Sequence, residues 1–149
     1  MRVRPGILLL NEKKNAVVLL RYHYGNADVF GIPGGNSIGK ETLLQTLKRE
    51  LLEELMVGIR VSHLAFIGEG LNREETKEVL HCIFVGRIVS GIPTVNPKHT
   101  SALGVEWKSL KHLPFLHLYP NFSQWLTDVS IVEPAHNVYV GTLHQHWFG

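Results

Sequence analysis

Apolar residues along the chain gather in short runs that are typical of strands. Near the N-terminus, residues 7–10 and 16–22 are two β-prone runs separated by the polar stretch 11–15. This spacing predicts a hairpin whose arms are largely buried. Residues 59–71 and 79–89 lie on either side of a charged turn and predict a long antiparallel pair. The pattern therefore favours a fold built around a β-sheet.

Three further elements are predicted in the second half of the chain. Residues 105–107 and 138–143 are typical of short strands. Asn121 is a suitable N-cap for a second helix, which we expect to run from residue 122 to about residue 129 with Trp125 facing the core. Strands and helices therefore alternate along the chain, as in an α/β protein.

Residues 42–55 form the strongest helix candidate, because they contain neither Pro nor Gly and are rich in Leu, Glu, Lys and Gln. At about 100° per residue, four of the leucines lie in one stripe: Leu44, Leu47, Leu51 and Leu55. The preceding residues 31–35, Gly-Ile-Pro-Gly-Gly, suit neither a helix nor a regular strand. We expect this loop to bring its backbone close to a site.

Size and composition suit one compact domain over residues 1–149. The 15 Lys and Arg residues exceed the 13 Asp and Glu by a net charge of +2, which is too small to favour nucleic acid or an acidic membrane surface. Cys82 is the only cysteine, which excludes an intramolecular disulfide, and its apolar neighbours predict a core position. The N-terminal apolar stretch is too short for a signal peptide or a membrane span, so we expect a soluble, cytoplasmic protein.

Three carboxylates share one edge of the predicted helix. Relative to Glu50, Glu53 lies about 60° to one side and Glu54 about 40° to the other. Like charges at these spacings each cost roughly a few tenths of a kcal/mol, so another group should compensate them. A divalent cation is the simplest candidate, because Mg²⁺ prefers oxygen ligands and completes its coordination with waters and substrate phosphates.

Taken alone, this acidic edge could equally be a solvated helix face or a docking face for another protein. The residues before it change the interpretation, because Gly35, Glu41 and Arg49 precede the carboxylates at fixed spacing. The segment 35–57 resembles the Nudix box, in which one Gly, one Arg and four Glu recur at these intervals. Six such matches arise by chance in roughly one frame in ten million.

The resemblance to the Nudix family extends from about residue 6 to residue 126 and implies an α/β/α sandwich around a mixed β-sheet. It also implies an Mg²⁺-dependent enzyme, with Mn²⁺ as an alternative cation, that hydrolyses a pyrophosphate bond in a nucleoside diphosphate linked to another moiety. The substrate would be a small nucleotide-like molecule such as ADP-ribose or a nucleotide sugar, and no sequence marker selects one. The alternative is a Nudix-like module that binds a nucleotide or regulates without turnover; the retained glutamates favour the enzyme.

The same resemblance implies a role for each residue of the box. The metal ligands would be four groups: the backbone carbonyl of Gly35 and the carboxylates of Glu50, Glu53 and Glu54. Arg49 would pair with Glu41 and hold a neighbouring glutamate in position, without touching the substrate. The base that takes the proton of the attacking water would be Glu50 or Glu53. The implied catalytic set is therefore Glu41, Arg49, Glu50 and Glu53.

Among the departures from the family pattern, which include Ile38 and Lys40 in the loop before the helix, two bear on the end of the helix and on the base. Met56 stands where the box has a glycine that ends the helix in a left-handed conformation, which costs a side chain roughly 1–2 kcal/mol. We expect Gly58 to take over that role. Some relatives also carry an acid in the loop before the strand that contains Glu106, whereas residues 98–103 contain none. His99 in this loop is either a substitute base or a bystander.

Two features outside the box, a group of aromatic residues and the C-terminal segment, each have more than one interpretation. Tyr22, Tyr24 and Phe30 precede the glycine loop, where each could stack on a base or belong to the core, and the core is favoured for Phe30. Residues 137–148 resemble no part of the family. We expect them to cover the edge of their own sheet or that of a second copy, which favours a homodimer.

Overall fold

The computed structural model describes residues 1–71, 78–126 and 137–144. Its strands form two four-stranded sheets. The first sheet has the order β1 (Arg2–Leu9), β5 (Glu78–Ser90), β4 (Gly58–Leu71) and β8 (Tyr139–Leu143). The second has the order β6 (Gly104–Ser109), β2 (Ala16–Tyr24), β3 (Ala27–Gly31) and β7 (Leu118–Tyr119). Within the described residues, the helical elements are α1 (Leu43–Leu55) and two 3₁₀ turns, η1 (Leu113–Phe115) and η2 (Ser123–Trp125).

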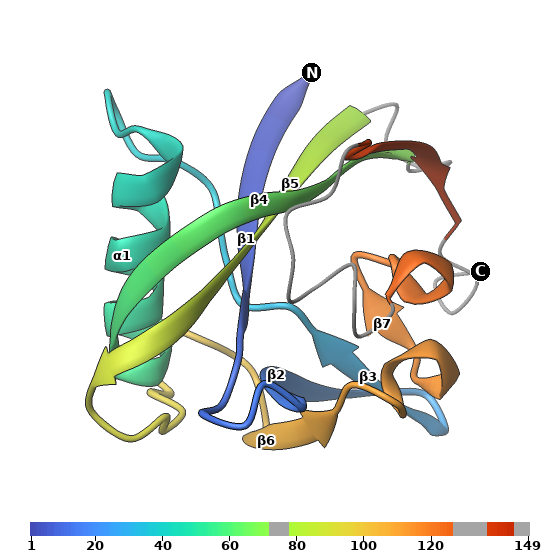
Figure 1. Cartoon of the computed structure of the whole chain (residues 1–149). Helices are drawn as coiled ribbons and strands as arrows, with labels where there is room; N and C mark the ends of the chain where they lie inside the picture. Colours follow the sequence, from blue (N-terminus) through green and yellow to red (C-terminus); the bar gives the residue numbers. More distant parts are fainter. Residues whose placement is uncertain (72–77, 127–136, 145–149) are drawn as a thin grey trace.

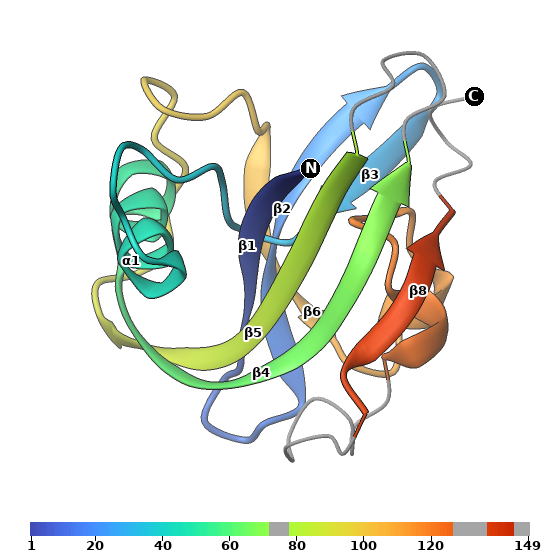
Figure 2. The same cartoon turned by 90° about the horizontal axis from the view of Figure 1, so that it is seen from above.

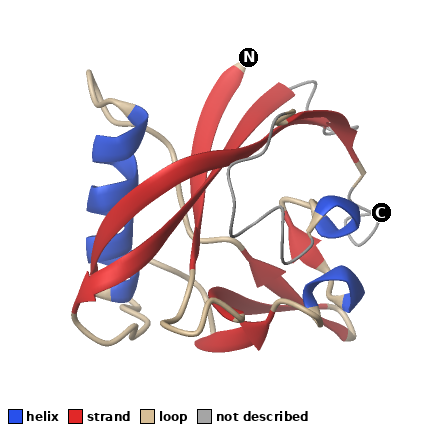
Figure 3. Cartoon of the chain, viewed as in Figure 1, coloured by secondary structure: helices blue, strands red, loops and turns tan. Residues whose placement is uncertain are grey.

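The elements are stacked in layers. Helix α1 covers one side of the molecule, the 3₁₀ turns lie on the opposite side, and the sheets run between them (Figures 1 and 2). Figure 3 shows the helical elements on both flanks of the strands. Each sheet combines parallel and antiparallel pairs. The predicted α/β/α sandwich around a mixed sheet is therefore confirmed, with the second helical layer reduced to 3₁₀ turns within the described residues.

Strand β1 is buried on both faces, because its side chains alternate between two hydrophobic clusters. Ile7 and Leu9 pack with the helix leucines, whereas Leu8 faces the cluster that contains Phe66 and Phe122. Each layer of the sandwich thus has its own core. Within the part of the chain that is described, no helix is long and apolar enough to cross a membrane.

The leucine stripe of α1 is correct for three of its four members. Leu47, Leu51 and Leu55 are fully buried, but Leu44 is 42% exposed. Thr46 is buried in its place and satisfies its hydroxyl through Glu41, Ser37 and the carbonyl of Thr42. The loop before the helix therefore packs against the polar side of the first helical turn. The leucine stripe did not predict this packing.

The predicted hairpin between the first two strands is wrong. β1 pairs in parallel with β5, and β2 pairs with β3 and β6, so the two strands belong to different sheets. Between them there is one isolated antiparallel bridge, Leu10 with Val17, beside which the N–H of Asn11 donates to the carbonyl of Ala16 at 3.0 Å. The long β4–β5 pair, which the sequence did predict, offers β1 a longer edge than β2 could. The predicted strands at 105–107 and 138–143 are both present as β6 and β8.

The second predicted helix is also wrong within the described residues. Asn121 accepts the backbone N–H of Ser123 at 3.3 Å, but only one 3₁₀ turn follows, and Leu126 is already extended. Residues 127–129 of the prediction lie outside the described residues. Trp125 and the buried Leu126 face the core as expected. Cys82 is buried as well, and burial raises the pKa of its thiol, which suits a core residue.

Helix α1 ends at Met56, which itself adopts the left-handed conformation at φ 60° and ψ 34°. Its N–H donates to the carbonyls of Leu51 and Leu52, as a C-terminal cap should. Gly58 does not take over this role, because it already belongs to β4. The cost of the left-handed conformation is therefore borne by Met56 itself, whose side chain is more than half exposed.

Met56→Gly is expected to raise the free energy of unfolding by roughly 0.5–1 kcal/mol. Glycine adopts this conformation without the penalty of a side chain, and part of the gain is lost to the greater freedom of the unfolded chain. Urea denaturation measures the change. The matched control is Leu52→Gly, an exposed position one turn earlier in ordinary helical geometry, which should lose about 1 kcal/mol. Destabilisation of the Met56→Gly protein would contradict this account.

Candidate functional site

The start of α1 is fixed by local sequence. Thr42 accepts the N–H of Gln45 at 3.2 Å, and the Gln45 side chain accepts the N–H of Thr42 at 2.9 Å, which completes a capping box. Glu41 directly precedes this cap and accepts the N–H of Ile38 at 2.8 Å. The loop and the first helical turn are therefore held together, and Glu41 faces the helix side chains one to two turns away.

Arg49 joins the loop to the carboxylates. Its Nε and Nη2 donate to the two oxygens of Glu41 at 2.8 and 3.0 Å, a bidentate pair. Its Nη1 donates to Glu50 at 3.1 Å and to Glu53 at 3.2 Å, and Nη2 also reaches the carbonyl of Asn36 at 3.0 Å. The expected pairing of Arg49 with Glu41 is present, and the guanidinium contacts two of the three carboxylates on the edge.

These contacts favour the charged form of both Glu41 and Arg49. The Arg49 hydrogen bond, followed by the N–H of Ile38, lowers the pKa of Glu41 to about 2. The same bond to Glu41 raises the pKa of Arg49. Both groups therefore stay charged near neutral pH, so neither is suited to transfer a proton there.

Gly35 lies directly against Glu50. Its N–H donates to the carbonyl of Pro5 at 3.2 Å, next to the bridge between Gly6 and Gly34. A Cβ at Gly35 would lie 2.4 Å from Cδ of Glu50 and 2.5 Å from Oε1, so the Glu50 carboxylate would have to move to make room for it. The backbone of the loop and the carboxylate of Glu50 thus form a close contact, called the cradle below, that a side chain at position 35 would disturb.

Glu54 is the carboxylate with the most perturbed ionisation. Burial is the main cause, and the charge of Glu50 together with their shared hydrogen bond adds to it, so the pKa of Glu54 rises to about 8. Without a cation, the Glu50–Glu54 pair therefore keeps a proton near neutral pH. A bound divalent cation would remove the reason for that proton, because it supplies the positive charge that this edge lacks.

The donor set fits a hard divalent cation by chemistry. Glu50, Glu53, Glu54 and the Gly35 carbonyl are all oxygen ligands, which Mg²⁺ prefers, and the uncompensated charge and the glycine cradle point the same way. Within the described residues, no three carboxylate, imidazole or thiol side chains are close enough to enclose an ion as they stand. Arg49 Nη1 bridges Glu50 and Glu53 in this arrangement, so their carboxylates must turn before they can converge.

The loop that follows β5 packs on the C-terminal end of α1. The N–H groups of Thr94 and Asn96 donate to the carbonyls of Leu55 and Glu54 at 3.0 and 2.9 Å. His99 is thereby placed with Nδ1 4.0 Å from Oε2 of Glu53. The sequence indicated His99 as a candidate base but did not predict its contact with Glu53, because this contact depends on how the loop packs on α1.

The aromatic candidates separate into two kinds. Phe30 is buried in the core, as expected, and Lys108 lies over its ring at 4.6 Å. Tyr22 is stacked with the half-exposed Tyr24 at 6.3 Å between ring centroids, and its hydroxyl is hydrogen-bonded to Thr100. Burial raises the pKa of Tyr22 and the charge of Glu54 raises it further, so this ring lies within electrostatic range of the carboxylate edge.

A model of the NUDIX domain matches residues 1–128 of this chain. The chain belongs to the Nudix family. Membership makes it a Nudix hydrolase, and the segment 35–57 is its Nudix box. Nudix hydrolases act on small nucleotide-like substrates and generally use divalent cations. No curated protein sequence matches the chain.

Solved structures share the fold at low identity. A MutT Nudix hydrolase from Burkholderia pseudomallei is 21% identical, with 74% of this chain and 84% of that chain covered and a TM-score of 0.63. A MutT protein from Bacillus halodurans is 20% identical over 95% and 88% of the two chains, with a TM-score of 0.69. An ADP-ribose pyrophosphatase from Streptococcus suis is 15% identical over 95% and 97%, with a TM-score of 0.65. At these identities the neighbours establish the fold.

Proposed function

We propose that this Nudix hydrolase cleaves a pyrophosphate bond in a nucleoside diphosphate linked to another moiety, with Mg²⁺ or Mn²⁺ as the cation. The observation that carries the proposal is the contact between Glu50 and the backbone of Gly35, with Glu53 and Glu54 on the same helix edge. The names of the structural neighbours, among them MutT proteins and an ADP-ribose pyrophosphatase, support a nucleotide substrate.

Each residue of the box has a separate task in this proposal. Glu50, Glu53, Glu54 and the carbonyl of Gly35 would hold the cation. When bound, the cation neutralises diphosphate oxygens and lowers the pKa of a nearby water. Glu50 or Glu53 accepts the proton of the attacking water, and His99, 4.0 Å from Glu53, is the second candidate for that proton.

Arg49 and Glu41 act by orientation. The bidentate pair fixes the guanidinium, and its Nη1 limits the positions open to the carboxylates of Glu50 and Glu53. Because Glu41 and Arg49 remain charged near neutral pH, this orientation does not change while other groups transfer protons.

Residues 1–149 are proposed to form a single domain. The family match ends at residue 128, but β8 lies beyond it and pairs in parallel with β4, where Ile67 is opposite Tyr139. Tyr139 also donates a hydrogen bond to Glu69 at 2.6 Å. The C-terminal segment therefore covers the edge of its own first sheet, one of the two roles that we expected for it. The homodimer stays a prediction.

The test is a substrate panel with and without metal. The purified protein is incubated at pH 8.5, where the Glu54 carboxyl can ionise, with Mg²⁺, Mn²⁺ or EDTA. The panel contains nucleoside triphosphates, ADP-ribose, nucleotide sugars and dinucleoside polyphosphates, and chromatography separates the products. We expect turnover of at least one nucleoside diphosphate derivative with metal and none with EDTA.

Two other outcomes assign the protein differently. Binding of panel members without turnover in either metal would favour a nucleotide-binding module. A melting temperature that Mg²⁺ does not change would favour the remaining alternative, an acidic helix face that docks another protein, because a ligand bound to the folded state must stabilise it.

A further inference from the structure

Arg4 is an arginine outside the Nudix box that the structure holds in a defined place. It lies on β1 directly opposite His81 of β5, and its guanidinium carbon is 5.5 Å from the centroid of the Tyr119 ring. His81 packs edge-on against the same ring at 5.6 Å. Burial, followed by the charge of Arg4, lowers the pKa of His81 to about 3, so the imidazole is uncharged and acts as packing. Tyr119 and His81 thus support the guanidinium without neutralising it.

The charge of Arg4 has no carboxylate partner within the described residues. Arg21 pairs with Glu106 at 3.2 Å and Arg49 pairs with Glu41, but no Asp or Glu among the described residues lies within ion-pair distance of Arg4. A guanidinium presents five N–H donors in a planar fork that matches phosphate oxygens, and stacking on an aromatic ring leaves its edge free to donate. Arg4 is therefore equipped to bind an anion.

Arg4 also lies next to the glycine loop. The adjacent residue, Pro5, accepts the N–H of Gly35, and Gly35 is in contact with Glu50. On the other side, Tyr119 accepts the N–H of Ile32 at 2.8 Å, so the residue that supports Arg4 is tied to the same loop. Burial is the main reason that the pKa values of Glu54 and Tyr22 are raised. The positive charge of Arg4 acts in the opposite direction and lowers both pKa values. Arg4 thus acts electrostatically on the carboxylate edge without touching it.

We propose that Arg4 binds a phosphate oxygen of the substrate diphosphate, on the β1–β7 side of the loop, while the carboxylates hold the cation. The proposal rests on the function proposed above. Three carboxylates carry more negative charge than one divalent cation balances, so the charge of a bound diphosphate needs a second positive group. Arg4 supplies it, and Tyr119 is the positioning residue that holds the guanidinium.

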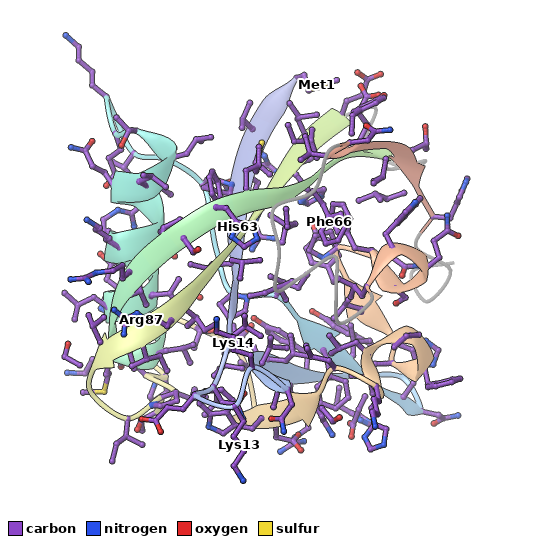
Figure 4. The ribbon with its side chains drawn as sticks, viewed as in Figure 1. Met1, Lys13, Lys14, His63, Phe66 and Arg87 are labelled. Atoms are coloured by element: carbon purple, nitrogen blue, oxygen red, sulfur yellow. The ribbon has the colours of Figure 1, made fainter. Side chains whose placement is uncertain are left out.

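The test compares three variants in calorimetric titrations with inorganic pyrophosphate in the presence of Mg²⁺. Arg4→Gln should weaken pyrophosphate binding about 10- to 100-fold, the range for a lost charged hydrogen bond, and Arg4→Lys should be intermediate. The control is Arg87→Gln, which removes the same charge from an exposed position of β5, far from Met1 and the start of β1 (Figure 4), and should bind like the wild type. With any nucleotide that is turned over, Arg4→Gln should raise KM by a similar factor and change kcat less.

The outcomes separate this inference from the proposed function. Unchanged pyrophosphate affinity in Arg4→Gln, or a wild-type protein that does not bind pyrophosphate, overturns the role of Arg4. Turnover of a nucleotide with an unaltered KM in Arg4→Gln overturns it too and leaves the hydrolase intact. Conversely, pyrophosphate binding that depends on Arg4, in a protein that hydrolyses no nucleotide, upholds the inference and removes the proposed function.

Discussion

Glu50→Gln should lower kcat/KM by roughly 10³-fold or more and leave the fold intact. The change keeps the size of the side chain that packs against Gly35, but it removes the charge that would hold the cation or accept the proton. It also removes the like-charge contact with Glu54, so the melting temperature without metal should stay equal or rise. Steady-state kinetics and a thermal melt on the same preparation measure both effects.

The control for this prediction is Glu12→Gln, which neutralises an exposed glutamate in the loop between β1 and β2. It should change neither activity nor melting temperature. A Glu50→Gln enzyme with activity within about tenfold of the wild type would contradict the assignment of Glu50, because a carboxylate at the reacting centre contributes at least that much.

Gly35→Ala should cost activity roughly 10²-fold or more through a single methyl group. The added Cβ would lie 2.4 Å from the carboxyl carbon of Glu50, so either the loop or the carboxylate must move. A displacement of about 1 Å at a reacting centre is enough for a loss of this size. The loop is anchored by the Gly6–Gly34 bridge, so we expect Glu50 to move and kcat to fall more than substrate affinity.

Gly104→Ala is the matched control, since a Cβ there meets nothing closer than 3.4 Å, at the end of the flexible Arg21 side chain. Circular dichroism should show native structure in both variants. If Gly35→Ala retained full activity while Gly104→Ala did too, the cradle between Gly35 and Glu50 would have no part in catalysis.

The carboxylates that we propose as cation ligands also belong to a salt-bridge network. Arg49 contacts Glu50 and Glu53, and Glu50 shares a hydrogen bond with Glu54, so every carboxylate on the edge has a partner. These contacts hold like charges together when no cation is present, which an isolated acidic helix could not do. The same contacts keep the carboxylates from converging, so cation binding and carboxylate rotation should be coupled.

The sequence by itself determined the parts of this protein that depend on local rules. The absence of helix breakers from Thr42 to Leu55 placed α1, and the helical period put Glu50, Glu53 and Glu54 on one edge. Fixed spacing then linked Gly35 and Arg49 to that edge. Alternating apolar runs located β4, β5, β6 and β8, because side chains on a strand repeat every two residues whatever the strand pairs with.

Only the tertiary structure decided which distant segments meet. The pairing of β1 with β5 in place of β2, the docking of His99 near Glu53 and the stacking of Arg4 on Tyr119 all join residues far apart in sequence. Periodicity carries no information about partners, since the same apolar strand can pair with several edges. The helical period likewise put Leu44 in the apolar stripe, but Leu44 is exposed, and the loop before α1 packs against the buried Thr46. Those choices depend on how the layers close around their two cores, and packing of the whole chain settles them.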